Sequence, residues 1–262
     1  MEESRGAGSL KVRRNRGAVR LHWEQYLFML PTISVMVFAG LLQAAPIILS
    51  DDDLGDNYYD AAPADLLGRK SWLGLFIGKE ESRENARESR LQVTQVRLVP
   101  RKESGSTIYR VVTTPPDATL LISGVPGVSA GAAVTLGRSI DLSSEKREAE
   151  FRFGNDVYRI RLVSAEPSYC DAVITLTLGE STQELFDATA PGKTKDPTLL
   201  VACDDPHFRI HWAGDLDRDG RLDMLVTFSH KYSYFPNQLL LSSVARSGEL
   251  VVEVARYERF SQ

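Results

Sequence analysis

The fold is set by the segment FRIHWAGDLDRDGRLDMLVTF, residues 208–228. Its two ends, residues 208–212 and 224–228, are rich in β-branched and aromatic residues, which favour strands. The stretch between them is rich in Asp and Gly, which favour turns. The segment therefore predicts a strand, a loop and a second strand, that is, a β-hairpin near the C-terminus.

Aspartates recur through the loop of this hairpin. Counted from Asp215 they occupy positions 1, 3, 5 and 9, and Gly220 at position 6 permits a sharp turn. Carboxylates this close repel one another unless a cation lies among them, and Ca²⁺ takes oxygen ligands at about 2.3–2.6 Å. We therefore expect a calcium site; the expected ligands are the side chains of Asp215, Asp217, Asp219 and Asp223 and the backbone carbonyl of Arg221. The alternative is a solvated acidic turn.

The loop differs from an EF-hand, which needs a bidentate Glu at position 12, because that position holds Val226. Residues 214–226 instead resemble the calcium loop of FG-GAP repeats, in which aspartates at positions 1, 3, 5 and 9 are the side-chain ligands. The resemblance implies these roles for the four aspartates of this loop. It covers a single copy, and a propeller needs the unit repeated at a fixed period, so the propeller of that family is not expected.

The N-terminus resembles a secretory signal. Residues 1–25 are basic, an apolar run of 17 residues follows over 26–42, and the small residues Ala44 and Ala45 come next. We expect residues 1–44 to be a signal peptide cleaved after Ala44, which places the protein in the periplasm or outside the cell. The alternative is an uncleaved anchor in the inner membrane through residues 26–42, although a membrane span needs about 20 residues.

The two cysteines, Cys170 and Cys203, are expected to form a disulfide, because an exported chain meets an oxidising environment. Such a bridge contributes about 3–4 kcal/mol in the chain-entropy model. The alternative is two buried free thiols.

Charge narrows the classes of partner. The chain has a formal net charge of −4, and residues 1–44 carry more basic than acidic side chains, so the mature chain is more acidic still. An acidic protein is a poor match for nucleic acid or an anionic membrane surface. We expect a protein or glycan ligand, no nucleic acid, and membrane contact only through an uncleaved N-terminal segment.

The remainder of the chain predicts a mostly β fold. Residues 45–69 are rich in Asp, Ala and Pro and are expected to be an exposed linker. From residue 70 to 262 short strand-like runs are separated by turn residues, and helical periodicity is nearly absent. Within residues 156–163, Tyr158, Ile160 and Leu162 lie on one face of the expected strand and the residues between them on the other. We expect an antiparallel sandwich or barrel-like assembly, with a candidate boundary between two subdomains near residues 126–145.

Two further patterns suggest other functions. Residues 127–131, GVSAG, match the nucleophile-elbow pattern around Ser129, but residues 132–137 do not predict the helix that should follow it. Residues 127–131 therefore have two interpretations: the active-site turn of a serine hydrolase that uses Ser129 with His207 or His211, or a flexible glycine-rich loop. Tyr232, Tyr234 and Phe235 could stack on sugars, or could pack in the core.

The two histidines lie four residues apart on a predicted strand. Residues i and i+4 of a strand lie about 13 Å apart, too far to bind one zinc ion at about 2.1 Å. We expect them to be packed or hydrogen-bonded. Together these patterns favour an exported, calcium-stabilised, non-catalytic binding or structural module; the alternatives are the hydrolase and a glycan-binding module.

Overall fold

The computed structural model describes residues 45–50, 54, 58–59, 66, 71–81, 86–189 and 203–260, and every regular element in them is a β-strand. The strands are β1 (Ile47–Leu49), β2 (Tyr58–Tyr59), β3 (Trp72–Glu81), β4 (Arg87–Glu103), β5 (Ser106–Thr114), β6 (Leu120–Ser123), β7 (Gly131–Asp141), β8 (Glu148–Phe153), β9 (Asp156–Val163), β10 (Val173–Leu178), β11 (Ser181–Asp187), β12 (His207–Asp215), β13 (Asp223–Ser229), β14 (Tyr234–Leu241) and β15 (Val252–Phe260). The predicted mostly β, antiparallel fold is confirmed. The predicted signal peptide or anchor, residues 1–44, lies outside the described residues.

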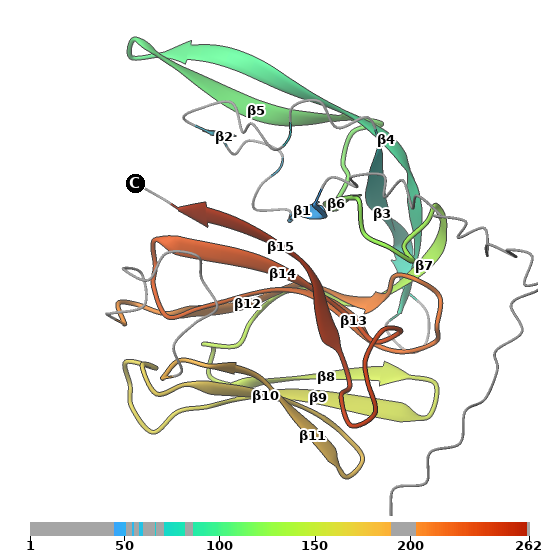
Figure 1. Ribbon diagram of the computed structural model, residues 1–262, viewed down its shortest axis with the longest axis vertical. Coiled ribbons are helices and arrows are strands. Elements are labelled where there is room, and N and C mark those ends of the chain that lie inside the picture. The colour runs from blue at the N-terminus through green and yellow to red at the C-terminus, as the bar shows by residue number, and fades with distance from the viewer. Residues whose placement is uncertain are drawn as a thin grey trace, which may run out of the picture. The chain divides into compact units, whose positions relative to one another are not determined.

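The larger sheet is antiparallel and nearly closes into a barrel (Figure 1). Its strand order is β1-β6-β3-β4-β7-β12-β13-β14-β15, and β1 lies beside β15, so the two ends of the sheet approach each other. The strand β5 pairs with β4 and β2 away from this path. The barrel interior is filled by aliphatic side chains and Trp212.

The smaller sheet has the order β11-β10-β9-β8 and packs against one face of the larger sheet (Figure 1). The alternation predicted for residues 156–163 is present, because Tyr158, Ile160 and Leu162 are buried and the residues between them are more exposed. These side chains meet Phe208 and Met224 of the larger sheet in one core. The second sheet is therefore an insertion between β7 and β12 that covers β12 and β13.

The predicted hairpin is formed by β12 and β13 in the middle of this architecture. A β-bulge between Ile210 and Trp212 shifts the register, and such a bulge re-aims the side chains beyond it. Phe208, Ile210 and Ala213 consequently face the smaller sheet, whereas Trp212 faces the barrel interior. The hairpin is thus buried on both faces, and its loop is held at the end of two rigid strands.

The predicted disulfide between Cys170 and Cys203 is present, with Cα atoms 5.6 Å apart. Cys170 lies between β9 and β10 of the smaller sheet, and Cys203 precedes β12. The bridge therefore ties the smaller sheet to the strand that begins the hairpin.

The expectation of an exposed linker over residues 45–69 is wrong for several described residues. Ile47, Ile48 and Leu49 are buried and pair with β6, and Leu54 and Leu66 are also buried. The short run Ile47–Leu49 covers the edge of β6 and fills the gap where the barrel closes. Its strand character was hidden by the Asp-rich residues that follow it.

The chain changes sheets between Asp141 and Glu148, at the ends of β7 and β8. This point adjoins the candidate boundary at residues 126–145. The two sheets nevertheless share a core.

Candidate metal centre

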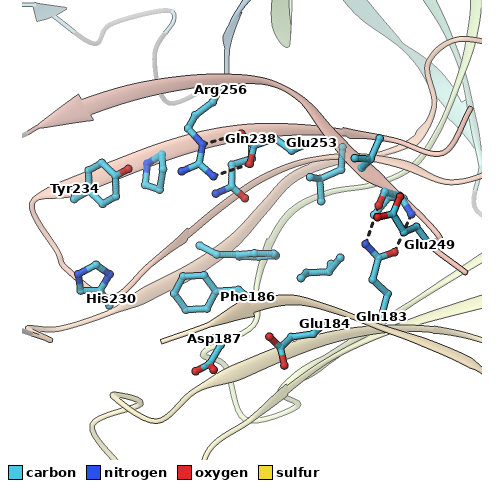
Figure 2. Close-up of a pocket in the computed structure, with 16 residues that line it drawn as sticks. Gln183, Glu184, Phe186, Asp187, His230, Tyr234, Gln238, Glu249, Glu253 and Arg256 are labelled. Atoms are coloured by element: carbon cyan, nitrogen blue, oxygen red, sulfur yellow. Dashed lines mark hydrogen bonds and ion pairs between the residues drawn. The ribbon is translucent and has the colours of Figure 1, made fainter. Parts of the chain in front are cut away.

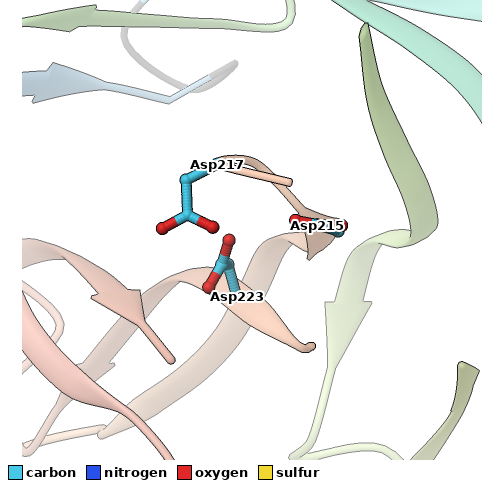
Figure 3. A group of neighbouring side chains, drawn as sticks. All are labelled: Asp215, Asp217 and Asp223. Atoms are coloured by element: carbon cyan, nitrogen blue, oxygen red, sulfur yellow. The ribbon is translucent and has the colours of Figure 1, made fainter. Parts of the chain in front are cut away.

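The hairpin brings three of the predicted ligands together. Asp215 is the last residue of β12, Asp223 is the first of β13, and Asp217 lies in the loop between them. One carboxylate oxygen from each lies within 4.8 Å of the others, so the three could hold a metal ion (Figure 3). Among the residues that the structure describes, these three aspartates are the only group of three or more His, Cys, Asp or Glu side chains that lie close enough to share a metal ion.

Backbone amides of the loop and of Ser242 fix two of these carboxylates. The amides of Arg218 and Gly220 donate to the two oxygens of Asp215, at 2.7 and 3.1 Å. The amides of Leu216 and Ser242 donate to the two oxygens of Asp223, at 2.8 and 2.9 Å. Gly220 has a φ of 79°, a left-handed conformation in which a residue without a Cβ is favoured. The loop is therefore preorganised around the carboxylates.

Asp217 supplies the strongest sign of a cation-binding site. Its Oδ2 accepts a hydrogen bond from the hydroxyl of Ser243, but its Oδ1 is buried and has no hydrogen-bond partner. A buried carboxylate oxygen without a partner is costly, and a cation placed among the three aspartates would remove that cost.

The electrostatics of the site also favour a cation. Burial raises the pKa of Asp223 to about 7, the hydrogen bonds from Ser242 and Leu216 oppose this rise, and the carboxylates of Asp217 and Asp219 add to it. Burial likewise raises the pKa of Asp215 above its ordinary value. Without a cation these two groups resist ionisation, and a bound cation would favour their charged forms.

The other predicted ligands are placed differently. Asp219 turns toward Arg221, whose Nε and Nη2 donate to its Oδ2 at 2.9 and 2.8 Å, and the hydroxyl of Ser242 donates to the same oxygen. Asp219 is therefore outside the group of three. The role of the Arg221 carbonyl remains a prediction. Sequence reasoning missed Ser242 and Ser243, because they reach the loop from beyond β14 and no local pattern marks them.

The glycine-rich loop around Ser129 contacts the aspartate-rich loop between β12 and β13. Arg218 donates from Nη2 to the Ser129 hydroxyl at 2.6 Å and from Nη1 to the Ala130 carbonyl at 3.3 Å. The strand β7 begins at Gly131, so the helix of a nucleophile elbow does not follow Ser129. These contacts favour a packing role for this loop, in which it supports the hairpin.

The prediction that the histidines are packed or hydrogen-bonded is confirmed: His211 is hydrogen-bonded and His207 is packed. His211 Nε2 shares a hydrogen bond of 2.8 Å with the Thr227 hydroxyl, and the His207 ring lies 4.8 Å from the Phe235 ring. Of the aromatic residues considered for sugar stacking, Tyr232 is exposed, Phe235 is half-buried and Tyr234 is buried. The three rings therefore do not form one exposed platform.

Comparisons with protein-family models, with curated proteins and with solved structures found no match to this chain. No helix among the described residues is long and apolar enough to cross a membrane. The disulfide indicates an oxidising compartment.

Metal affinity is expected to fall as the pH drops below about 7, because a cation must then displace the proton on Asp223. For one displaced proton, binding should be roughly tenfold weaker at pH 6 than at pH 8. Titration calorimetry at both pH values, in two buffers of different ionisation enthalpy, measures the affinity and the proton released. Equal affinities at the two pH values would contradict this coupling.

The raised pKa of Asp223 also predicts how the stability of the metal-free protein depends on pH. The folded pKa of Asp223 lies above the ordinary value of 3.8. The contribution of this group to stability is therefore fully present below that value and is lost as the pH rises to about 7. Saturating metal should remove this trend in chemical unfolding.

Proposed function

We propose that this chain is an exported, non-catalytic binding or structural module whose central hairpin is held by a calcium ion. The proposal is carried by the convergence of Asp215, Asp217 and Asp223 and by the buried Oδ1 of Asp217, which has no hydrogen-bond partner. This hairpin lies between the two hydrophobic cores, so an ion at its loop would stabilise the strands on which both depend.

The donor atoms support calcium over other cations. The group offers carboxylate oxygens only. Among the described residues, no cysteine sulfur and no histidine nitrogen belongs to it. Hard oxygen ligands suit Ca²⁺ and Mg²⁺ rather than zinc or copper. Calcium accepts the larger and less regular shell that carboxylates and a carbonyl would form, whereas magnesium demands near-octahedral geometry. The spacing shared with FG-GAP loops supports the same ion.

Export is supported by the disulfide together with the basic, apolar and small-residue order of residues 1–44. We infer a periplasmic or secreted protein; anchoring through residues 26–42 is the alternative. A calcium site fits such a compartment, where weak sites can stay filled.

Saturating calcium is expected to raise the melting temperature of the wild-type protein. Binding to the folded state stabilises it by about 2.7 kcal/mol at a hundredfold excess over Kd. Asp217→Asn should remove most of this gain, since it removes a charge from the group of three. Asp205→Asn, which changes an exposed turn residue outside the group, should retain it.

The measurement is a set of melting curves with calcium, with magnesium and with a chelator. Magnesium should substitute poorly. An equal gain in the wild type and in Asp217→Asn would place the ion elsewhere and refute the proposal.

A further inference from the structure

Two loops that are distant in the sequence contact each other beside the barrel core. One is the aspartate-rich loop between β12 and β13, residues 216–222, and the other is the glycine-rich loop between β6 and β7, residues 124–130. Both loops contribute apolar side chains to the barrel core: Leu216 from the first loop, and Val125 and Val128 from the second. The two loops therefore pack against one common core.

Arg218 joins the two loops through its side chain. Its Nη2 donates to the Ser129 hydroxyl at 2.6 Å, and its Nη1 donates to the Ala130 carbonyl at 3.3 Å. A Cβ at position 131 would overlap Nη1 of Arg218, so Gly131 leaves the space that the guanidinium fills. The planar fork of an arginine can serve two acceptors at once, whereas the ammonium group of a lysine does not match that geometry. The contact thus depends both on an arginine at residue 218 and on a residue without a side chain at 131.

The backbone of Arg218 is fixed by a carboxylate of the candidate metal centre. Its amide donates to Oδ1 of Asp215 at 2.7 Å, and the residue takes a left-handed φ of 72°. Residues with a Cβ adopt this conformation rarely and at a cost, so it persists only where the surroundings impose it. Leu216 is held in a similar way, because its amide donates to Oδ2 of Asp223 at 2.8 Å. The placement of Leu216 and Arg218 therefore depends on where these two carboxylates lie.

We propose that calcium binding holds the glycine-rich loop, residues 124–130, against the barrel through Arg218, and that loss of the ion releases this loop. Asp215, Asp217 and Asp223 lie close together (Figure 3), and their charges repel one another when no cation lies between them. With the ion bound, the carboxylates converge and the amides of Leu216 and Arg218 keep their acceptors. Without it, repulsion between the ionised carboxylates would loosen the turn that positions Arg218.

The inference rests on the proposed calcium site and adds its regulation, because the ion would order a second loop that lies outside the candidate metal centre. The bound and released states differ in the contacts that Arg218 makes. The ion therefore has the differential interaction with two states that a shift in their populations requires. In an exported protein, calcium would then protect residues 124–130 from proteases.

The test is limited proteolysis of the full chain by elastase, which cleaves after small residues such as Val128 and Ala130. Mass spectrometry of the fragments identifies the cuts within residues 124–130, and a small chromogenic substrate corrects for any effect of calcium on the enzyme itself. Saturating calcium, compared with a chelator, is expected to slow these cuts about tenfold, which is within the usual range of coupling between two sites. Equal rates in the two conditions would overturn the proposal.

Arg218→Lys removes the contact between the loops and keeps the charge near the metal centre. This variant should lose most of the calcium-dependent protection, because an ammonium group does not reproduce the two-pronged contact. Arg246→Lys, at an exposed arginine outside both loops, is the matched control and should retain the protection. Undiminished protection in Arg218→Lys would show that Arg218 does not couple the loops.

Gln183→Ala controls for a general loss of stability. Gln183 lines a cleft beside β11 (Figure 2), where its amide accepts from the backbone of Leu250 and Val251 and donates to the Val251 carbonyl. Its loss should destabilise the protein and leave the calcium-dependent protection of residues 124–130 in place. If Gln183→Ala loses this protection as fully as Arg218→Lys does, the protection reports overall stability and the proposal is refuted.

Coupling between an ion and a loop is reciprocal, so the loop must also affect calcium affinity. Ser129→Ala removes one acceptor of Arg218 and leaves the sequence of the aspartate-rich loop unchanged. Calorimetry should show calcium binding weakened about three- to tenfold, the factor that corresponds to one hydrogen bond. Ser106→Ala, at an exposed serine in the tip of the β4–β5 hairpin, should bind calcium as the wild type does. Unchanged affinity in Ser129→Ala would contradict the coupling.

The calcium site and the coupling fail in different ways. If the wild type binds calcium and the cuts within residues 124–130 do not depend on the ion, the coupling is refuted and the calcium site stands. If the wild type binds no calcium, both are refuted.

Discussion

Replacing Trp212 by Ala is expected to lower the free energy of unfolding by about 3–5 kcal/mol. Trp212 is fully buried and packs in the barrel core with Leu75, Leu91 and Leu225. Removing the indole would leave a cavity in the core beside β12, the strand that leads into the aspartate-rich loop. The Nε1 hydrogen bond to the buried Thr135 hydroxyl, 2.8 Å long, would be lost as well.

Urea unfolding followed by circular dichroism measures this change without depending on tryptophan fluorescence. Trp212→Phe should cost less, because it retains most of the packing and loses the hydrogen bond, which contributes about 0.5–1.5 kcal/mol. Tyr232→Ala, at an exposed aromatic residue, should stay within about 0.5 kcal/mol of the wild type. A Trp212→Ala loss no larger than that of Tyr232→Ala would contradict the placement of Trp212 in a packed core.

Removing the disulfide by the double substitution Cys170→Ser and Cys203→Ser is expected to cost about 3–4 kcal/mol. The bridge joins residues 33 apart in sequence and therefore restricts the unfolded chain strongly in the entropy model. In the folded state it ties the smaller sheet to the start of β12. The loss should appear at all calcium concentrations, because neither cysteine contacts the metal loop among the described interactions.

The matched comparison is the wild type in its oxidised and reduced forms, by urea unfolding with and without a reductant. The reduced wild type should match the double variant. Identical unfolding midpoints for the oxidised protein and the double variant would show that the bridge contributes no stability.

The hairpin could be predicted from sequence because its signals are local. Strand-forming residues flank a loop of Asp and Gly, and the structure places β12 and β13 there. The alternation of β9 was equally readable, because one face of that strand is buried and the other is exposed. Such a pattern can be read from one strand alone, because successive side chains of that strand alternate between a buried face and an exposed face.

Features that depend on distant partners could not be predicted. The bulge at His211 occurs in the pairing of β12 with β13, whereas the pairing of β12 with β7 is regular at this point, so the bulge depends on a partner strand. Asp219 lies outside the group of three, because its carboxylate binds Arg221 and Ser242 instead. Ser242 lies beyond β14, so no local pattern marks it. The burial of Ile47–Leu49 depends on pairing with β6, more than 70 residues later in the chain.

The most direct test is a calorimetric titration of calcium into the metal-free wild type and into Asp217→Asn, with Asp205→Asn as the control. We expect one ion per chain in the wild type and in Asp205→Asn, and much weaker binding in Asp217→Asn, because Asp217 supplies one of the three carboxylates and holds the unpartnered oxygen. The absence of binding to the wild type at millimolar calcium, with a melting curve that a chelator leaves unchanged, would contradict the metal centre and reduce the loop to an acidic turn.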